Sequence, residues 1–278
     1  MTENLVLKRI GKVLVYILLV AAALGILLPF YWMVMSSIKT NNEVFTVPIK
    51  WWPDIPQWQH YVEIFAKSDM TTWLKNTLLL SVVVTFMQVL TGSFAAYGFS
   101  KVRFPGRDVL FLAYIGTIAV PWQSYMIPQF RLLSDMGLAN TLWSIIALQA
   151  FGAFGVFLMK QFFETIPEDL SEAARLDGLS EYGIYARIMM PLSVPAIASL
   201  TLLTFVTTWN DYLGPLIYLR NPDLWTIQLG LRTFVSQYDA DYALIMTGAV
   251  LSTLPIAIIF LLGQRYFIEG IASTGLKG

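Results

Sequence analysis

The sequence predicts an all-α integral membrane protein with six transmembrane helices. Of its 278 residues, 56% are hydrophobic and only 13% are charged, and the mean hydropathy is +0.63. A soluble domain of this size has roughly 45–50% apolar and about 25% charged residues. Several apolar runs are also long enough to cross about 30 Å of hydrocarbon as helices of about 20 residues. Composition and run length together therefore indicate a multi-pass membrane protein.

The six apolar runs make up a single transmembrane domain over residues 1–278. They are Leu14–Met35, Thr77–Phe99, Val109–Ile127, Thr141–Met159, Val194–Leu219 and Ala243–Leu262. Pro121 and Trp122 interrupt the third run, and the polar stretch Trp209–Asp211 interrupts the fifth. The first run continues past the length of a secretory signal core, so we expect it to be a retained anchor.

Lysine and arginine placement predicts the orientation. With the N-terminus inside, the inside segments hold eleven of these residues and the outside segments hold seven. Cytoplasmic segments of membrane proteins carry the excess of positive charge. We therefore expect both termini in the cytoplasm of a bacterial plasma (inner) membrane, in agreement with an even number of spans.

The segment 165–191, on the expected cytoplasmic side, predicts a helix–turn–helix. Thr165 followed by Glu168 matches a capping box, which begins a helix. Gly178 suits the position just past a helix end. These signals predict a short helix over Ile166–Asp177, and Ser180 can cap a second helix that runs toward Met190.

Small and apolar residues form one stripe on the first of these helices. Ile166, Leu170 and Ala173 recur at helical spacing, and Ala174 widens the stripe. Alanine side chains allow another protein surface to approach closely. A compact cytoplasmic projection of this kind suits a groove on a partner protein.

The same segment resembles the cytoplasmic signature of permease subunits of binding-protein-dependent ABC importers. That signature runs Glu-Ala-Ala, three residues, Gly, nine residues, Ile, one residue, Leu, Pro. Glu172-Ala173-Ala174, Gly178, Ile188 and Pro191 stand in its positions, and Met190 occupies the leucine position. The stretch from Trp209 to Leu216 and the closing Gly275–Gly278 are similar to the maltose and multiple-sugar permeases of that family.

The resemblance implies a type I ABC importer permease with a cytoplasmic coupling helix. It implies a second permease subunit, two ATPase subunits and an extracytoplasmic solute-binding protein as partners. It also implies that the ATPase binds the signature loop, through Glu172, Ala173, Ala174, Asp177, Gly178, Ile188 and Pro191. The substrate that it implies is a carbohydrate, which we expect to be a di- or oligosaccharide.

Sequence motifs give no sign of an ATPase or a metal centre in this chain. Gly270 and Gly275–Lys277 approach a Walker A loop, but the following Ser or Thr is missing and no helix follows. The chain has no cysteine and one histidine, His60, which disfavours thiolate and histidine metal sites. We therefore expect no catalytic residues and no cofactor in this chain, with ATP and Mg²⁺ bound by the ATPase partners.

Two polar and aromatic clusters in the interrupted runs are candidates for the substrate path. Small-ligand sites combine aromatic walls with a few placed polar groups. The clusters are Trp122, Gln123 and Tyr125 in the third run, and Trp209, Asn210, Asp211 and Tyr212 in the fifth. Interfacial anchoring and packing between helices are the alternatives for these residues.

A secondary carrier or channel that works without an ATPase is the alternative function. Such carriers place ionisable residues at membrane depth or show repeated halves. The apolar runs contain almost no ionisable residues apart from Asp211, and no repeat is evident. A membrane enzyme is the third possibility, for which the chain offers few catalytic groups.

Overall fold

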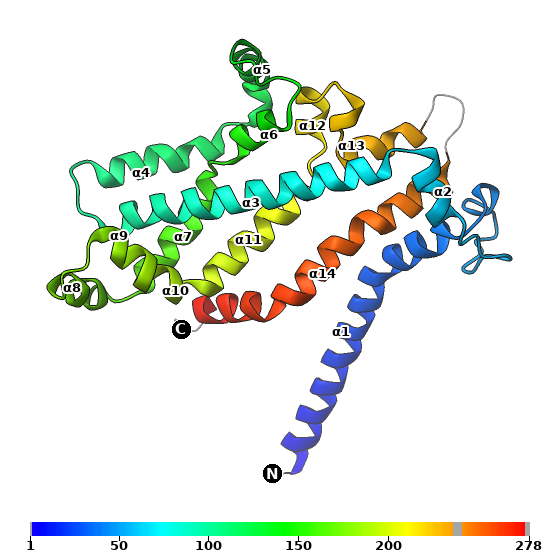
Figure 1. Cartoon of the computed structure of the whole chain (residues 1–278). Helices are drawn as coiled ribbons and strands as arrows, with labels where there is room; N and C mark the ends of the chain where they lie inside the picture. The colour runs from blue at the N-terminus through cyan, green and yellow to red at the C-terminus, as the bar shows by residue number, and fades with distance from the viewer. Residues whose placement is uncertain (1, 236–240, 276–278) are drawn as a thin grey trace. The chain divides into compact units, whose positions relative to one another are not determined.

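The computed structural model describes residues 2–235 and 241–275, and the side chains of residue 9, of 11–235 and of 241–264. Within these ranges the chain is mostly helical and contains no β-strand (Figure 1). The all-α expectation is therefore confirmed.

Four of the described helical segments are long and apolar enough to cross a membrane. They are Gly11–Ser37, Met70–Lys101, Leu142–Thr165 and Tyr242–Gln264. The first belongs to α1 (Thr2–Ser37), the second is α3 (Met70–Lys101), and the last belongs to α14 (Tyr242–Gly275). The third consists of α6 (Leu142–Gln149) and α7 (Ala153–Thr165) with a break between them. These segments contain the first, second, fourth and sixth predicted runs.

The other two predicted runs are broken near Pro121 and Trp122 in the third run and near Trp209–Asp211 in the fifth. The third run holds α4 (Arg107–Gly116), the turns η2 (Thr117–Ala119) and η3 (Trp122–Ser124), and the start of α5 (Met126–Asp135). The fifth holds α11 (Val194–Trp209) and α12 (Leu213–Tyr218).

Proline and a side-chain hydrogen bond explain these breaks. Pro121 has no N–H to continue the helical hydrogen bonds, and Asp211, which precedes the N-cap Tyr212, accepts from Gly214 N–H in the first turn of α12 at 3.0 Å. Residues Glu181–Leu192 and α11 are long and apolar enough to cross a membrane only when they are taken together, and the two segments are bent by 80° relative to each other. Six membrane crossings stay a prediction.

The described chain divides into two compact units. The first contains residues up to Ser68 and Leu231–Leu254, and the second contains Asp69–Gly230 and the segment from Pro255. The first unit includes η1 (Asn41–Glu43), α2 (His60–Lys67) and η6 (Leu231–Phe234), and the second includes η5 (Pro222–Leu224) and α13 (Ile227–Gly230).

Polar contacts to the end of α1 organise the first unit. The Ser37 carbonyl accepts a hydrogen bond from Thr247 Oγ1 at 3.1 Å, and His60 Nδ1 lies 3.0 Å from the same carbonyl oxygen. Lys39 is fully buried, with its Nζ donating to the Lys50 carbonyl and lying 4.0 Å from the Trp32 ring centroid. The contact between His60 Nδ1 and the Ser37 carbonyl gives His60 a structural hydrogen-bonding role.

The second unit is built on α3, against which α7 and α11 pack (Figure 1). Glycine allows the close approach of α3 and α7, because a Cβ on Gly92 would lie 3.3 Å from the Gly155 carbonyl carbon. A Cβ on Gly155 would lie equally close to Leu200 of α11. Small residues commonly let membrane helices approach in this way.

Replacing Gly92 by leucine should destabilise the second unit. The added side chain would meet the backbone of α7, and overpacking typically costs about 1–3 kcal/mol. Gly98→Leu is the matched control, because Gly98 lies on the same helix and a Cβ there would meet nothing within 4 Å. Thermal unfolding of the detergent-solubilised variants should show a lower melting temperature for Gly92→Leu alone. Equal melting temperatures would contradict the close α3–α7 contact.

Candidate functional site

Residues 165–191, hereafter the elbow, form a chain of short helices at one end of the second unit. They comprise α8 (Glu168–Leu176), α9 (Glu181–Ile184), the π-helical turn η4 (Tyr185–Met189) and the start of α10 (Met190–Leu192). The helix expected over Ile166–Asp177 therefore begins two residues later and ends one residue earlier. The second helix runs on past Met190, as the sequence predicts.

The caps of the elbow only partly follow the sequence signals. The Thr165–Glu168 capping box is wrong: Pro167 is the N-cap of α8, and Thr165 Oγ1 donates to the Phe162 carbonyl at 2.7 Å. Thr165 is unavailable because it is the last residue of α7. Gly178 has φ +82°, as a residue past a helix end requires, and Ser180 Oγ accepts from Gly183 N–H at 3.3 Å.

The elbow exposes one face and packs the other into the second unit. Ala174 is only 5% exposed and joins a buried cluster with Tyr97 of α3 and Phe163 of α7. The residues of the signature that remain exposed are Glu172, Ala173, Asp177, Gly178 and Pro191.

The expected stripe of Ile166, Leu170, Ala173 and Ala174 is therefore wrong as a single docking face. Ile166 precedes α8 and packs into the buried cluster with Ala174, and Ile188 also packs against that cluster. The exposed apolar surface of the elbow consists of Leu170, Ala173 and Leu176. Leu176 is 89% exposed.

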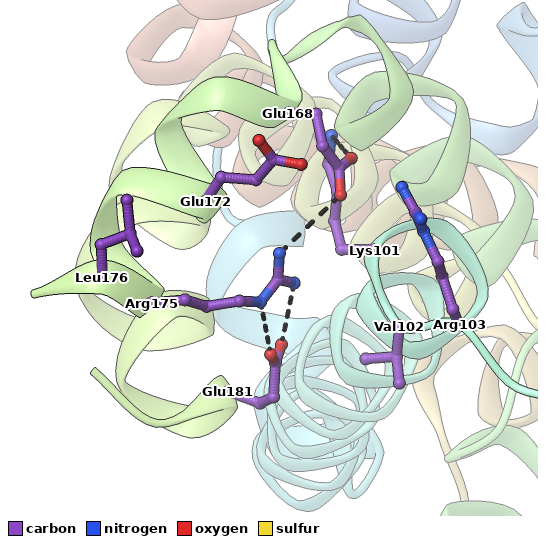
Figure 2. A pocket seen from close by; sticks show the side chains of 8 residues that line it. All are labelled: Lys101, Val102, Arg103, Glu168, Glu172, Arg175, Leu176 and Glu181. Atoms are coloured by element: carbon purple, nitrogen blue, oxygen red, sulfur yellow. Dashed lines mark hydrogen bonds and ion pairs between the residues drawn. The ribbon is translucent and has the colours of Figure 1, made fainter. Parts of the chain in front are cut away.

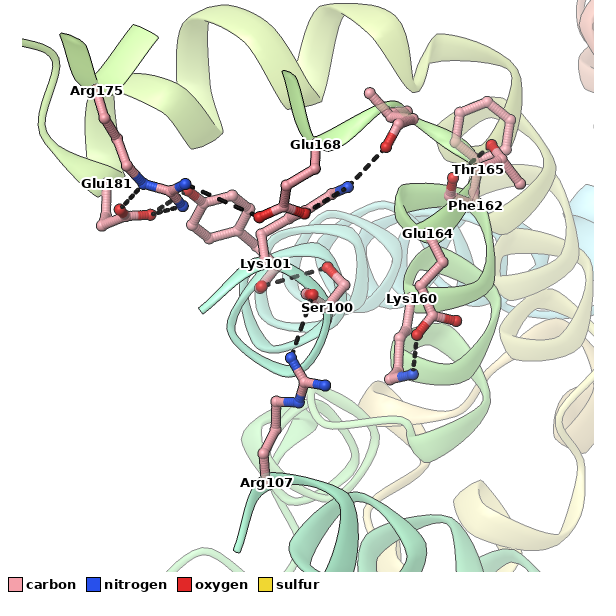
Figure 3. A network of polar contacts seen from close by, with 12 residues as sticks. Ser100, Lys101, Arg107, Lys160, Phe162, Glu164, Thr165, Glu168, Arg175 and Glu181 are labelled. Atoms are coloured by element: carbon pink, nitrogen blue, oxygen red, sulfur yellow. Dashed lines mark hydrogen bonds and ion pairs between the residues drawn. The ribbon is translucent and has the colours of Figure 1, made fainter. Parts of the chain in front are cut away.

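A network of charges ties the elbow to the end of α3 (Figures 2 and 3). Buried Lys101 donates from Nζ to the Ile166 carbonyl at 2.7 Å and lies 3.6 Å from the Glu168 carboxylate. Arg175 lies 3.9 Å from Glu168 and donates from Nε to Glu181 Oε1 at 2.8 Å. Two elbow helices and one long helix therefore share a single set of ion pairs.

Tyrosines extend this attachment along α3. Tyr97 OH donates to Glu181 Oε2, and Ser93 Oγ lies 2.8 Å from Tyr185 OH in the π-helical turn. The Arg175 guanidinium lowers the pKa of the Glu181 carboxyl, and the same hydrogen bond raises the pKa of Arg175. Both groups are therefore charged at neutral pH, and the network keeps its ion pairs.

Sequence patterns did not reveal this network. Arg175 and Glu181 are six residues apart, which is not a spacing that brings side chains together on a helix. They meet because the turn at Gly178 folds α9 back toward α8. A groove of about 660 Å³ lies beside them and is lined by Lys101, Val102, Arg103, Glu168, Glu172, Arg175, Leu176 and Glu181.

A second cavity, of about 770 Å³, lies where the broken helices of the second unit meet. Its polar and aromatic lining comes from α3, α5, α6, α7, α11, α12 and the segments between them. These residues are Gln88, Trp122, Tyr125, Gln129, Gln149, Phe154, Thr204, Thr207, Thr208, Asp211 and Tyr218.

Side chains satisfy the backbone where α6 breaks beside this cavity. Gln88 Nε2 donates to the Gln149 carbonyl at 2.8 Å, and Thr91 Oγ1 donates to the Ala150 carbonyl at 2.7 Å. The last carbonyls of a helix lack partners within it, and at membrane depth such groups must bond to protein. The carbonyls of Gln149 and Ala150 at this break therefore have hydrogen-bond partners within the protein.

Three of the seven predicted path residues line the cavity: Trp122, Tyr125 and Asp211. Trp209 does not line it, because its side chain is 1% exposed and stacks on Phe205 with ring centroids 5.5 Å apart. Gln123, Asn210 and Tyr212 are not among the lining residues either.

The sequence analysis missed most of the polar lining. One signal was available on α11, because Leu203, Thr204, Thr207 and Thr208 recur at helical spacing and line the cavity together with Asp211, which follows the helix. The glutamines come from distant helices and needed the fold to bring them together. Among the described residues, no three His, Cys, Asp or Glu side chains gather as a metal site would require.

Comparison with known proteins agrees with this architecture. Residues 88–272 match the family described as the inner membrane component of binding-protein-dependent transport systems. The arabinooligosaccharide transport permease AraQ of Halalkalibacterium halodurans is 31% identical over 90% of this chain and 91% of its own length. The lactose transport permease LacG of Rhizobium radiobacter is 31% identical over 96% of this chain and 97% of its own.

A solved structure shares the fold over nearly the whole chain. It is a bacterial ABC transporter involved in import of the acidic polysaccharide alginate, with a TM-score of 0.82 and 26% identity. The match covers 93% of this chain and 97% of the other. With its helical fold, its elbow and these matches, the chain belongs to the family of inner-membrane permease components of binding-protein-dependent ABC transport systems.

Proposed function

We propose that the chain carries a carbohydrate, specifically a di- or oligosaccharide, into the cytoplasm, and that ATP hydrolysis on partner subunits drives the movement. The observation that carries this proposal is the attachment of the elbow, whose signature residues are largely exposed, to α3 by the network around Lys101 and Glu181. The names of the relatives, which handle arabinooligosaccharides and lactose, support a sugar substrate.

The elbow is the part of the chain that the ATPase subunits would bind. Glu172, Ala173, Asp177 and Gly178 are exposed, together with the apolar side chains of Leu170 and Leu176. A short helix with an exposed apolar edge is suited to a groove on a partner. Ala174 and Ile188 contribute by packing the elbow onto its own unit, and Pro191 begins the turn toward α11.

The proposed mechanism has two states. ATP binding would close the ATPase pair and displace the elbow, and the network would pass that displacement to α3. Hydrolysis would return the elbow to its first position. A ligand shifts such an equilibrium only if it favours one state over the other, so ATP must bind more tightly to the complex with the displaced elbow.

The partners in this proposal are a second permease subunit, two ATPase subunits and an extracytoplasmic solute-binding protein. ATP and Mg²⁺ would bind to the ATPase subunits, and this chain would hold no cofactor. The cavity beside Trp122, Tyr125 and Asp211 would form part of the substrate path, because aromatic faces and amide or hydroxyl groups are the side chains that bind sugars.

Reversing the charge of Glu172 should weaken ATPase binding. Loss of one member of a hydrogen-bonded charge pair that the complex buries costs about 2–5 kcal/mol, so Glu172→Lys should reduce co-purification of the ATPase by about tenfold or more. Asp108→Lys is the control, because it reverses an exposed carboxylate in the first turn of α4, outside the elbow. Pull-down from solubilised membranes measures the effect, and equal ATPase recovery in both variants would argue against docking at the elbow.

Neutralising Glu181 should separate ATPase binding from transport. Glu181→Gln keeps the size of the side chain but weakens its bonds to Arg175 and Tyr97. We expect the ATPase still to co-purify, while substrate-stimulated ATP hydrolysis in liposomes falls by about fivefold, equivalent to about 1 kcal/mol of lost coupling. Glu164→Gln, which removes a carboxylate paired with Lys160, should leave stimulation unchanged. Normal substrate stimulation of ATP hydrolysis in Glu181→Gln would show that the network around Glu181 does not couple the ATPase to transport.

Cysteine labelling tests the proposed orientation, since the chain has no native cysteine. A membrane-impermeant maleimide should label Val47→Cys in intact spheroplasts and Asp108→Cys only in inverted vesicles. Both positions are exposed, and Val47 is 93% exposed. The opposite labelling pattern would place both termini outside the cytoplasm.

A further inference from the structure

The cavity of the second unit has a mostly apolar lining with a few polar side chains, and the only charged side chain among its described lining residues is that of Asp211. Its hydrogen-bonding groups are the amides of Gln88, Gln129 and Gln149 and the hydroxyls of threonines and tyrosines. Asp211 is a carboxylate, and none of the described residues that line the cavity is Lys, Arg or His. Arg220 lies against the ring of Phe130, 5.3 Å from its centroid, and is not part of the lining.

Neutral donors hold the Asp211 carboxylate in a fixed position. Oδ1 accepts from Gly214 N–H at 3.0 Å, and Oδ2 accepts from Gln149 Nε2 at 2.7 Å. Among the described residues, no cation lies within ion-pair distance of it. Amide donors stabilise a carboxylate without cancelling its charge, so its field extends into the cavity.

The amides around Asp211 are themselves ordered by hydrogen bonds. Gln149 Oε1 accepts from Thr208 Oγ1 at 3.3 Å, and Gln88 Oε1 accepts from Thr204 Oγ1 at 3.4 Å. On the aromatic side, Trp122 Nε1 donates to Gln129 Oε1 at 2.8 Å. The cavity therefore presents a fixed pattern of neutral hydrogen-bonding groups around one negative charge.

We propose that this cavity is a charge filter that admits uncharged polyhydroxylated ligands and disfavours anionic ones, with Asp211 as the residue that sets the discrimination. The proposal rests on the sugar-import function proposed above and narrows its substrate class to neutral sugars. A sugar hydroxyl can donate to the carboxylate and exchange hydrogen bonds with the amides. A uronate carboxylate would be repelled by Asp211 and would find no cationic partner in this lining.

The filter would distinguish this chain from the transporter that it resembles in fold, whose cargo is the acidic polysaccharide alginate. Proteins usually bind carboxylates through arginine or lysine, because these cations form charge-assisted hydrogen bonds with them.

Modification of a cysteine placed in the cavity tests the filter. Thr207→Cys puts a thiol on an exposed lining position of α11, one turn before Asp211, in a chain without other cysteines. The full chain, purified in lipid nanodiscs with any subunits that accompany it, is treated with methanethiosulfonates that carry either a sulfonate or an uncharged glucosyl group. Each rate is divided by that of a free thiol with the same reagent.

Neutralising Asp211 in this background gives the decisive comparison. From Coulomb interactions over a few ångströms, partly screened by water, Asp211→Asn should speed the sulfonate reagent by about three- to tenfold. Both reagents react with the thiolate, whose fraction also rises when the nearby carboxylate is removed, so the sulfonate acceleration is measured relative to the change in the glucosyl rate. Asp223→Asn is the matched control, since it removes an exposed carboxylate that does not line the cavity, and it should change neither rate.

An unchanged sulfonate rate in Asp211→Asn, or an equal increase for both reagents, would overturn the filter. If Asp211→Asn does not fold, the Thr207→Cys chain alone decides: added salt should speed the sulfonate reagent relative to the glucosyl reagent. A salt-independent sulfonate rate would also overturn the proposal. The measurement needs neither ATP nor a binding protein, so a failure of the filter is distinguishable from a failure of ATP-driven sugar import.

Discussion

The buried ammonium group of Lys101, at the end of α3, holds the elbow against that long helix. It donates to the carbonyl of Ile166 at 2.7 Å and lies 3.6 Å from Glu168, while its side chain is only 4% exposed. A buried charge is costly unless polar partners compensate for its lost hydration. Displacing the elbow from α3 would remove those partners, so the two elements are expected to move together. Glu181, bonded to both Arg175 and Tyr97, adds a second attachment.

The cavity depends on a related constraint, which is the need to satisfy backbone groups where membrane helices break. Gln88 and Thr91 of α3 donate to the carbonyls that end α6, and Asp211 accepts from the backbone of α12. Gln88 and Asp211 also line the cavity. Interrupted helices thus place hydrogen-bonding atoms in a cavity whose lining is otherwise mostly apolar, because Gln88 and Asp211 both satisfy backbone groups at a break and line the cavity.

Particular residues show how far local sequence signals reach. Gly178 and Ser180 were predictable, because a positive φ and a helix N-cap are local requirements that few residue types meet. Thr165 misled for an equally local reason: its capping pattern was real, but the preceding helix α7 extends to include it. Ala174 was predicted on the outward stripe and is buried, because the direction in which α8 faces depends on how the elbow packs against Tyr97 and Phe163.

The sequence by itself determined the membrane class, most of the apolar helices, the elbow and its family signature, since these depend on composition and short-range spacing. Tertiary structure decided which groups meet. Lys101 and Ile166 are 65 residues apart, and Gln149 and Asp211 are 62 apart. It also decided that Trp209 packs within the protein while Gln88 and Gln149 reach the cavity. Hydrogen bonds between distant helices leave no periodic trace in the chain, because they depend on helix packing rather than on the local conformation of either segment.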